Sequence, residues 1–333
     1  MRRNTRRRFM IASAAVAGAA AIPSVFAQPL RKINFITPFG FLIGFAPTLN
    51  AQAGGHFARE GLDVTVLPGK GSAVAVQQVI AGRAVYGRGD PLAVAKAVAE
   101  GAPIITFATA LHRSPIVVYS APQKPIRNAR DMPGKVIGIA AKGSASDNIM
   151  DMMLATLGLP LDAARREAVG NSPGGWGLIQ QGRLDAHIVS IGTTTTLQES
   201  GENIYLWNTS DAVPMPGQAY FALRETVQKE ADLLLRILRA EKTSMIEVRK
   251  GDGRMLVERM AKHWEIEEAK NIAFAVKAMR NEEPLWWHED TSKLLKNDAA
   301  TWKSMIDGMI KAGLLKPGFS PDRLYTDEIT SKL

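Results

Sequence analysis

The sequence contains no cysteine, and this absence excludes several classes of protein. A chain without thiols has no disulfide framework, no cysteine nucleophile and no thiolate metal site. The histidines are few and show neither H-x-x-x-H nor H-E-x-x-H spacing; they are His56, His112, His187, His263 and His288. Neither paired carboxylates nor a nucleophile with its base stands out. We therefore expect no catalytic residue, no metal and no cofactor.

Long apolar runs are also scarce. The one that stands out, residues 10–22, is shorter than the roughly 20 residues that cross a bilayer. It follows Thr5-Arg6-Arg7-Arg8-Phe9, a pattern typical of twin-arginine export signals, and Val25-Phe26-Ala27 carries the residues that a signal peptidase reads. The sequence thus predicts a signal peptide over residues 1–27, cleavage after Ala27 and a periplasmic location. A basic nucleic-acid-binding arm is the alternative, but the uncharged run has no polar face.

Little net charge remains once this segment is removed. Residues 1–27 contain five arginines and no acid, so the net charge falls from +9 to +4 in the remaining 306 residues (333 minus 27). That chain has no cluster of basic residues, and binding to nucleic acid is not expected. Mild positive charge is compatible with a small acidic ligand. The length is sufficient for two hydrophobic cores without cross-links.

Short apolar runs alternate with helical patterns from Leu30 to about Ser190, which predicts an α/β fold with a mostly parallel sheet. Strands are expected over residues 31–37, 62–67, 84–87, 103–108 and 116–119, and helices over 46–57, 73–81 and 91–100. A second series has strands over 135–140 and 186–190 and a helix over 144–157, and a later strand is expected over 218–223. Gly82, Gly101 and Gly158 are expected to end helices.

Two breaks, at residues 121–125 and 211–217, interrupt this pattern. They predict a chain that crosses to a second lobe and returns. We expect residues 28–118 to form the first part of lobe 1, residues 119–214 lobe 2, and residues 215–333 the return to lobe 1 with a helical C-terminal region. From Arg224 onward, apolar residues recur every three or four positions, as in amphipathic helices.

Several segments resemble a known family when they are taken in order. The first is Gly54-Gly55-His56-Phe57-Ala58-Arg59-Glu60-Gly61-Leu62-Asp63-Val64; it is followed by Ala81-Gly82-Arg83-Ala84, Gly101-Ala102-Pro103-Ile104, Asp131-Met132-Pro133-Gly134-Lys135 and Gln181-Gly182-Arg183-Leu184-Asp185-Ala186. Together they are similar to the nitrate, sulfonate, taurine and pyrimidine-precursor branch of ABC-transporter periplasmic solute-binding proteins. The resemblance covers residues 30–225 well and the C-terminal helices more loosely.

This resemblance implies a two-lobed periplasmic-binding-protein fold that closes on a small organic anion, such as a sulfonate, an aromatic carboxylate or a pyrimidine-like compound. It also implies delivery of that ligand to a membrane permease and its ATPase by a monomeric protein. Two other functions remain open. A sensor on the same fold would present its ligand to a receptor, and a pyrimidine-synthesising enzyme shares the fold but carries a cysteine motif that this chain lacks.

Ligands of α/β proteins bind at the carboxyl ends of strands, so residues at these ends are the candidates. In lobe 1, Phe39 follows the first strand and would stack on a planar ligand or simply pack. Gly71 and Ser72 open a helix, where backbone amides would bind an acidic group or Ser72 would merely cap the helix. Asp90 is expected to cap the next helix, and Arg88 beside it faces the cleft or solvent. Thr109 and Arg113 follow the fourth strand, where a surface role is the alternative.

Lobe 2 supplies the strongest candidate, the loop Gly143-Ser144-Ala145 between a strand and a helix. Unpaired amides and the dipole at a helix N-terminus favour an anion, and the family resemblance points to the same loop. Ser190 and Gly192 occupy the equivalent end of a later strand, with helix capping as the alternative. Trp176 lies among glycines that would allow close approach of a ligand, although packing explains it equally well.

Overall fold

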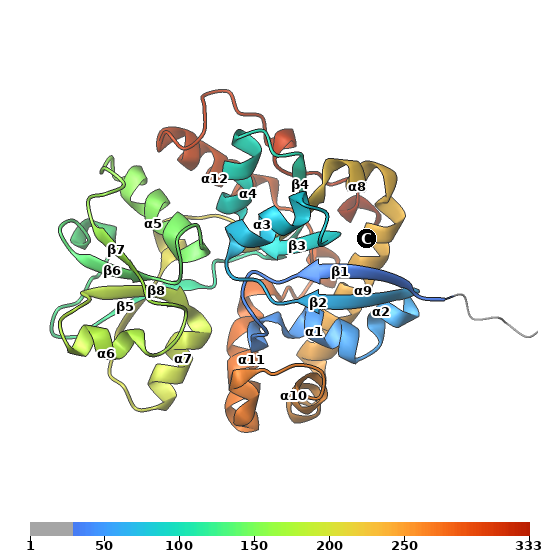
Figure 1. The fold of residues 1–333 in the computed structure, drawn as a ribbon, viewed down its shortest axis with the longest axis horizontal. Helices are drawn as coiled ribbons and strands as arrows, with labels where there is room; N and C mark the ends of the chain where they lie inside the picture. Colours follow the sequence, from blue (N-terminus) through green and yellow to red (C-terminus); the bar gives the residue numbers. More distant parts are fainter. Residues whose placement is uncertain (1–28) are drawn as a thin grey trace, which may run out of the picture.

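Two five-stranded sheets, each covered by helices on both faces, make up the described part of the chain (Figure 1). The structure is a computed structural model that describes residues 29–333. The predicted signal peptide, residues 1–27, lies outside these residues. Among the helices of residues 29–333, none has the length and apolar character that a membrane span requires.

The sheet of lobe 1 has the strand order β2-β1-β3-β10-β4. Its strands are β1 (Arg31–Ile36), β2 (Leu62–Leu67), β3 (Tyr86–Gly89), β4 (Ile104–Leu111) and β10 (Gln218–Leu223). The first three run parallel, whereas β10 is antiparallel to both β3 and β4. Every residue of β3 and β4 is buried; β4 is accordingly a continuous run of apolar and small residues, whereas β3 contains one charged residue, Arg88.

The sheet of lobe 2 has the order β7-β6-β8-β5-β9. Its strands are β5 (Ile116–Ser120), β6 (Val136–Ile139), β7 (Arg165–Ala168), β8 (Ala186–Ser190) and β9 (Tyr205–Asn208). Here β6, β7 and β8 are parallel, and β5 is antiparallel to its neighbours β8 and β9. Each sheet therefore contains one reversed strand beside an otherwise parallel βα series.

Three hydrophobic cores fill the layers. One face of the first sheet packs against helices α1 (Ala46–Ala53), α2 (His56–Arg59), α8 (Arg224–Lys229), α9 (Ala231–Lys250), α10 (Gly253–Ala261) and α11 (Ile272–Trp286). A second core runs through both lobes under α3 (Ser72–Ile80), α4 (Pro91–Ala99), α5 (Ala145–Thr156) and α12 (Ala299–Lys311). The third lies under α6 (Gly175–Gln180) and α7 (Ile191–Glu199) in lobe 2. Figure 1 shows these helices around the sheets, with the C-terminal helices in orange and red against lobe 1.

The helix boundaries follow local chemistry. Asp90 caps α4 by accepting a hydrogen bond from the Leu92 amide at 3.1 Å, and Pro91 occupies the first helical turn. The glycines expected after α3 and α4 have φ values of +70° at Gly82 and +95° at Gly101, a region that residues with a side chain rarely adopt. The predicted helix over residues 46–57 is divided into α1 and α2 by a turn at 54–55.

The two lobes are joined by two crossing segments. The first runs between β4 and β5, at residues 112–115, and therefore precedes both the predicted break at 121–125 and the predicted boundary after residue 118. The cause is strand pairing: β5 joins β8 and β9 of lobe 2, so the prolines after it form a turn within that lobe. The second crossing, residues 209–217, contains the predicted boundary after residue 214. The crossings are hydrogen-bonded to each other, since the Ser114 amide donates to the Ser210 hydroxyl at 3.1 Å.

Candidate functional site

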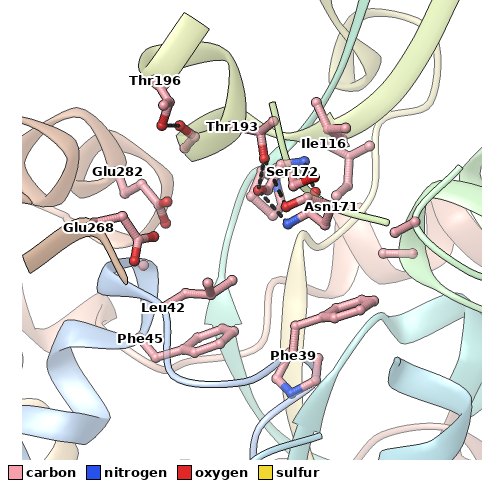
Figure 2. A pocket seen from close by; sticks show the side chains of 18 of the residues that line it. Phe39, Leu42, Phe45, Ile116, Asn171, Ser172, Thr193, Thr196, Glu268 and Glu282 are labelled. Carbon is pink, nitrogen blue, oxygen red and sulfur yellow. Dashed lines mark hydrogen bonds between the residues drawn. The ribbon is translucent and has the colours of Figure 1, made fainter. Parts of the chain in front are cut away.

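A cavity of about 630 Å³ lies between the lobes, beyond the carboxyl ends of parallel strands from both sheets. Figure 2 shows side chains from several separate segments converging on this space. Lobe 1 contributes residues that follow β1 and β2, Arg88 within β3, and residues of the C-terminal helical region. Lobe 2 contributes the segments after β6, β7 and β8. A site built in this way depends on both lobes being present.

The apolar part of the cavity comes mainly from lobe 1. Phe39, Leu42 and Phe45 lie together along one side of the cavity (Figure 2), and Phe274 of α11 adds a further ring. All three of the first group belong to the segment between β1 and α1, where the short 3-10 helix Ile43–Phe45 turns the chain back toward the sheet. Ile116 faces them from lobe 2. Such walls suit an apolar or planar ligand body.

Arg88 provides a buried positive charge at this site. It is only 2% exposed, its Nε donates to the Gln218 side-chain oxygen at 2.6 Å, and its guanidinium carbon lies 5.0 Å from the centre of the Phe45 ring. Arg88, Gln218 and Phe45 all line the cavity. The sequence left open whether Arg88 faces the cleft or solvent. In the structure it faces the cleft.

Two carboxylates face the same space. Glu268, in the short 3-10 helix Glu267–Lys270, and Glu282, in α11, both point into the cavity (Figure 2). Burial raises the pKa of Glu282 to about 7, with nearby Arg88 acting in the opposite direction and Glu268 adding to the rise. Burial likewise raises the pKa of Glu268. One Oε atom of Glu268 is buried without a hydrogen-bond partner among the described residues.

Lobe 2 presents two helix N-termini to the cavity. At the start of α5, the Ser144 and Ser146 hydroxyls are 2.9 Å apart, and the amides of Ala145 and Ser146 have no partner among the described residues. At the start of α7, Ser190 is held by Asn171, whose side chain donates to the Ser190 hydroxyl and accepts from its amide, both at 2.9 Å. The positive ends of two helix dipoles and free amides give this side affinity for an acidic group.

Six of the twelve residues predicted from strand ends line the cavity: Phe39, Ser72, Ser144, Ala145, Ser190 and Gly192. Gly71 and Gly143 are their chain neighbours and shape the two loops without lining the cavity. Ser72 also has a structural role, because its hydroxyl accepts a hydrogen bond from the Asp90 amide at 3.1 Å. Contact with a ligand stays a prediction for all of them.

The other four predicted residues lie away from the cavity. Asp90 caps α4, as the sequence also suggested, and accepts from the Asn148 side chain at 2.9 Å. Thr109 donates to Asn297 at 2.9 Å and accepts from Trp302 at 3.2 Å. Arg113 is exposed on the first crossing. Trp176 donates to Glu202 at 2.6 Å and packs in the core under α6, which corresponds to the packing role considered for it.

Several residues that line the cavity were not predicted, among them Asn171, Gln218, Glu268 and Glu282. Glu282 has a signal that sequence analysis could use. It falls on the buried stripe of α11 together with Ala275, Ala278, Met279 and Trp286, so an acidic residue occupies an apolar position of an amphipathic helix. Asn171 and Gln218 have no comparable signal, because single amides are common in loops and at strand ends.

The described residues contain no group of three or more His, Asp or Glu side chains arranged to hold a metal ion. None of the described residues that line the cavity is a histidine. Among its serines, Ser144 and Ser146 are engaged with each other, Ser72 accepts from a backbone amide, and Ser190 accepts from the side chain of Asn171. The arrangement can hold a small ligand through amides, hydroxyls and charges.

The model of the NMT1/THI5-like family matches residues 43–250 of this sequence. The chain belongs to this family. No curated protein sequence gives a significant match. The NMT1/THI5-like region includes both crossings and the strand ends that face the cavity, except the end of β1.

Solved structures share the fold of this NMT1/THI5-like protein at low sequence identity. The alkanesulfonate-binding protein SsuA from Xanthomonas axonopodis pv. citri, bound to MOPS, has a TM-score of 0.63 and 14% identity over 85% of this chain and 94% of SsuA. The periplasmic nitrate-binding protein NrtA from Synechocystis PCC 6803 has a TM-score of 0.65 and 12% identity over 91% of this chain and 88% of NrtA. The desulfurization enzyme DSZB has a TM-score of 0.55 and 12% identity over 91% of this chain and 98% of DSZB.

These likenesses confirm the α/β periplasmic-binding-protein fold with two lobes that the sequence predicted, and the resemblance to solute-binding proteins of ABC transporters. They support a binding role for the NMT1/THI5-like chain.

Proposed function

We propose that this protein is the periplasmic substrate-binding component of an ABC importer and captures a small organic solute that carries an acidic group. The observation that carries this proposal is the cavity between the lobes, whose lining comes from both lobes and includes two helix N-termini. Closure of the lobes around the solute would bring these amides and the lobe 1 rings together. A sulfonate, an aromatic carboxylate or a pyrimidine-like compound fits this chemistry.

The remaining parts of the proposal follow from this role. The chain would be exported, cleaved after Ala27 and active as a monomer that delivers its ligand to a membrane permease with an ATPase. A sensor that presents ligand to a receptor would use the same cavity and differ only in its partner. An enzyme would require turnover of the ligand, and the described lining of the cavity contains no histidine to activate its serines.

Thermal unfolding in the presence of candidate solutes tests the proposal. The protein from Gln28 onward is mixed with aliphatic and aromatic sulfonates, aromatic carboxylates, nitrate and pyrimidine precursors, because a ligand that binds only the folded state raises the midpoint of unfolding. A selective, saturable rise without conversion of the ligand supports the binding function. Conversion of a ligand would replace it with an enzymatic function, and the absence of any rise would contradict the proposed ligand class.

A further inference from the structure

The cavity contains more negative charge than a site for a simple anion requires. Its charged lining residues are Arg88, Glu267, Glu268, Lys270 and Glu282. Glu267 and Lys270 pair with each other at 2.6 Å on an exposed edge, so they contribute little to the interior. Arg88 is the remaining cation of the lining beside two carboxylates, and it lowers the pKa both of Glu282 and of a third carboxylate, the buried Glu241. At least one carboxylate therefore has no matching cation in the described lining.

Glu282 is the more informative of the two carboxylates. It is 9% exposed, points into the cavity (Figure 2), and makes no hydrogen bond to any described residue. A buried carboxylate without a partner is costly, and such a group in a cleft is more often part of a binding site than of the framework. Glycine at position 44 leaves room for this carboxylate, because a Cβ there would lie 2.7 Å from its Oε1.

The second lobe also approaches this carboxylate. A Cβ at Gly192, the second residue of α7, would lie 3.4 Å from Oε1 of Glu282, which is ordinary contact distance. The start of α7 thus covers the acidic side of the cavity, while the rings of Phe39 and Phe45 border it below in Figure 2. In this enclosed setting, a positively charged group of the ligand would gain more from two carboxylates than it would in water.

On these grounds, and resting on the proposed function above, we propose that Glu268 and Glu282 form an acidic subsite that binds a protonated amine or amidine nitrogen of the solute. The solute then carries two oppositely charged groups on an apolar or planar body. Its basic nitrogen lies against Glu268 and Glu282, and its acidic group lies against the amides at the start of α5. Each carboxylate accepts hydrogen bonds from the nitrogen, so the ligand supplies the cation that the lining lacks.

Matched pairs of ligands separate this subsite from the proposed function. The protein is titrated with para-(aminomethyl)benzoate and para-methylbenzoate, and with homotaurine and propanesulfonate, with binding measured by calorimetry. Within each pair the acidic group and body are kept and the basic nitrogen is lost. We expect the amino compound to bind at least about tenfold more tightly than its partner in at least one pair, as for a hydrogen-bonded charge.

Variants of the two carboxylates give the decisive comparison. Glu282→Gln and Glu268→Gln should each weaken binding of the amino compound about tenfold and should leave or strengthen binding of the partner without nitrogen, because repulsion of its acidic group is relieved. Glu265→Gln, an exposed carboxylate of the same segment, should change neither. A structural role for Glu282 would instead weaken both members of a pair alike.

The outcomes are distinguishable. Equal binding of both members of every pair, unchanged in Glu282→Gln, would overturn the acidic subsite and leave the binding function standing. Binding by neither member of any pair would contradict the proposed ligand class and the subsite with it. Weaker binding of the amino compound in Glu282→Gln, with binding of its partner unchanged or stronger, would support both.

Discussion

Gly44 and Gly69 both border the region between β1 and the cavity, yet a side chain at each would meet a different obstacle. A Cβ at Gly44 would clash with the carboxylate of Glu282, which is the free end of a flexible side chain beside an open cavity. A Cβ at Gly69 would clash with the backbone carbonyl of Thr37, and the Gly69 amide also donates to the Thr37 hydroxyl at 3.2 Å. Only the first obstacle can move aside without shifting the backbone.

We therefore expect Gly69→Ala to lower the free energy of unfolding by about 1–3 kcal/mol, as in overpacked sites, and Gly44→Ala to lower it by less than about 1 kcal/mol. Urea unfolding of the ligand-free protein measures both. Gly177→Ala serves as the control, since a Cβ there meets nothing within 4 Å and alanine is the better helix former. Equal losses in Gly44→Ala and Gly69→Ala would mean that Glu282 is held rigidly and not free to move in the cavity.

Individual site residues were predictable only where the strand and the helix after it were recognised. Ser144 and Ser190 lie at strand–helix junctions that the sequence marks clearly, each just before its helix, and both line the cavity. Trp176 was also considered because it lies among glycines, but these glycines serve close packing: a Cβ at Gly175 would clash with His187. Glu268 and Glu282 come from a part of the chain distant in sequence, and no local pattern shows that it returns to the cleft.

The strands and helices were more predictable than the site. Residues 62–67, 186–190 and 218–223 are strands with the predicted bounds. The second and third are almost entirely buried, and the first alternates buried apolar residues with more exposed ones, as in a half-buried strand. Strands β7 and β9 were missed. They are edge strands of their sheet, all their residues are half-buried or exposed, and so they lack a continuous apolar run. The first crossing was misplaced because pairing of β5 with β8 is a long-range contact that composition does not reveal.

Helix α9 packs against α1 through a polar contact inside lobe 1. Thr48 of α1 donates to Glu241 of α9 at 3.1 Å and lies 3.0 Å from the hydroxyl of Tyr220. Burial raises the pKa of Glu241 to about 7, while hydrogen bonding and Arg88 act in the opposite direction. The folded protein therefore binds more protons at this site than the unfolded chain does between about pH 4.5 and pH 7. This carboxyl lowers stability progressively as the pH rises through that range.

Replacing Glu241 with glutamine removes this pH-dependent cost. The stability of Glu241→Gln relative to the natural protein should rise by on the order of 2 kcal/mol between about pH 5 and pH 8, measured by urea unfolding at several pH values. Glu225→Gln is the matched control. Because a hydrogen bond from Lys229 lowers the pKa of the exposed Glu225, the stability of this variant relative to the natural protein should change with pH in the opposite direction. A difference between Glu241→Gln and the natural protein that does not change with pH would contradict the pKa assigned to Glu241.

Besides the crossings, the described parts of the lobes contact each other on two sides, through α4 and α12 on α5 and through α11 on α7. On one side, Lys96 of α4 donates to Asn148 and Asp151 of α5 at 2.9 and 2.7 Å, over a hydrophobic core that is continuous between the lobes. On the cavity side, Lys277 of α11 pairs with Glu199 of α7, and both side chains are about half exposed. The first contact is built into the core, whereas an exposed ion pair contributes little. Opening of the cleft is therefore expected to separate α7 from α11 and to leave α4 on α5.

Cross-linking α7 to α11 tests this opening directly. The sequence has no cysteine, so Glu199→Cys with Lys277→Cys introduces the only two thiols, which a short bifunctional maleimide can join. If entry of the ligand requires separation of these helices, protein cross-linked while empty should bind a ligand found by thermal unfolding much more slowly than the uncross-linked double variant. Protein cross-linked after binding should retain its ligand through dialysis.

The two single-cysteine variants, treated with the same reagent, control for chemical modification. Equal exchange rates before and after cross-linking would mean that solutes reach the cavity without movement of α7 relative to α11, and the cleft would then open at the α4–α5 side or not at all.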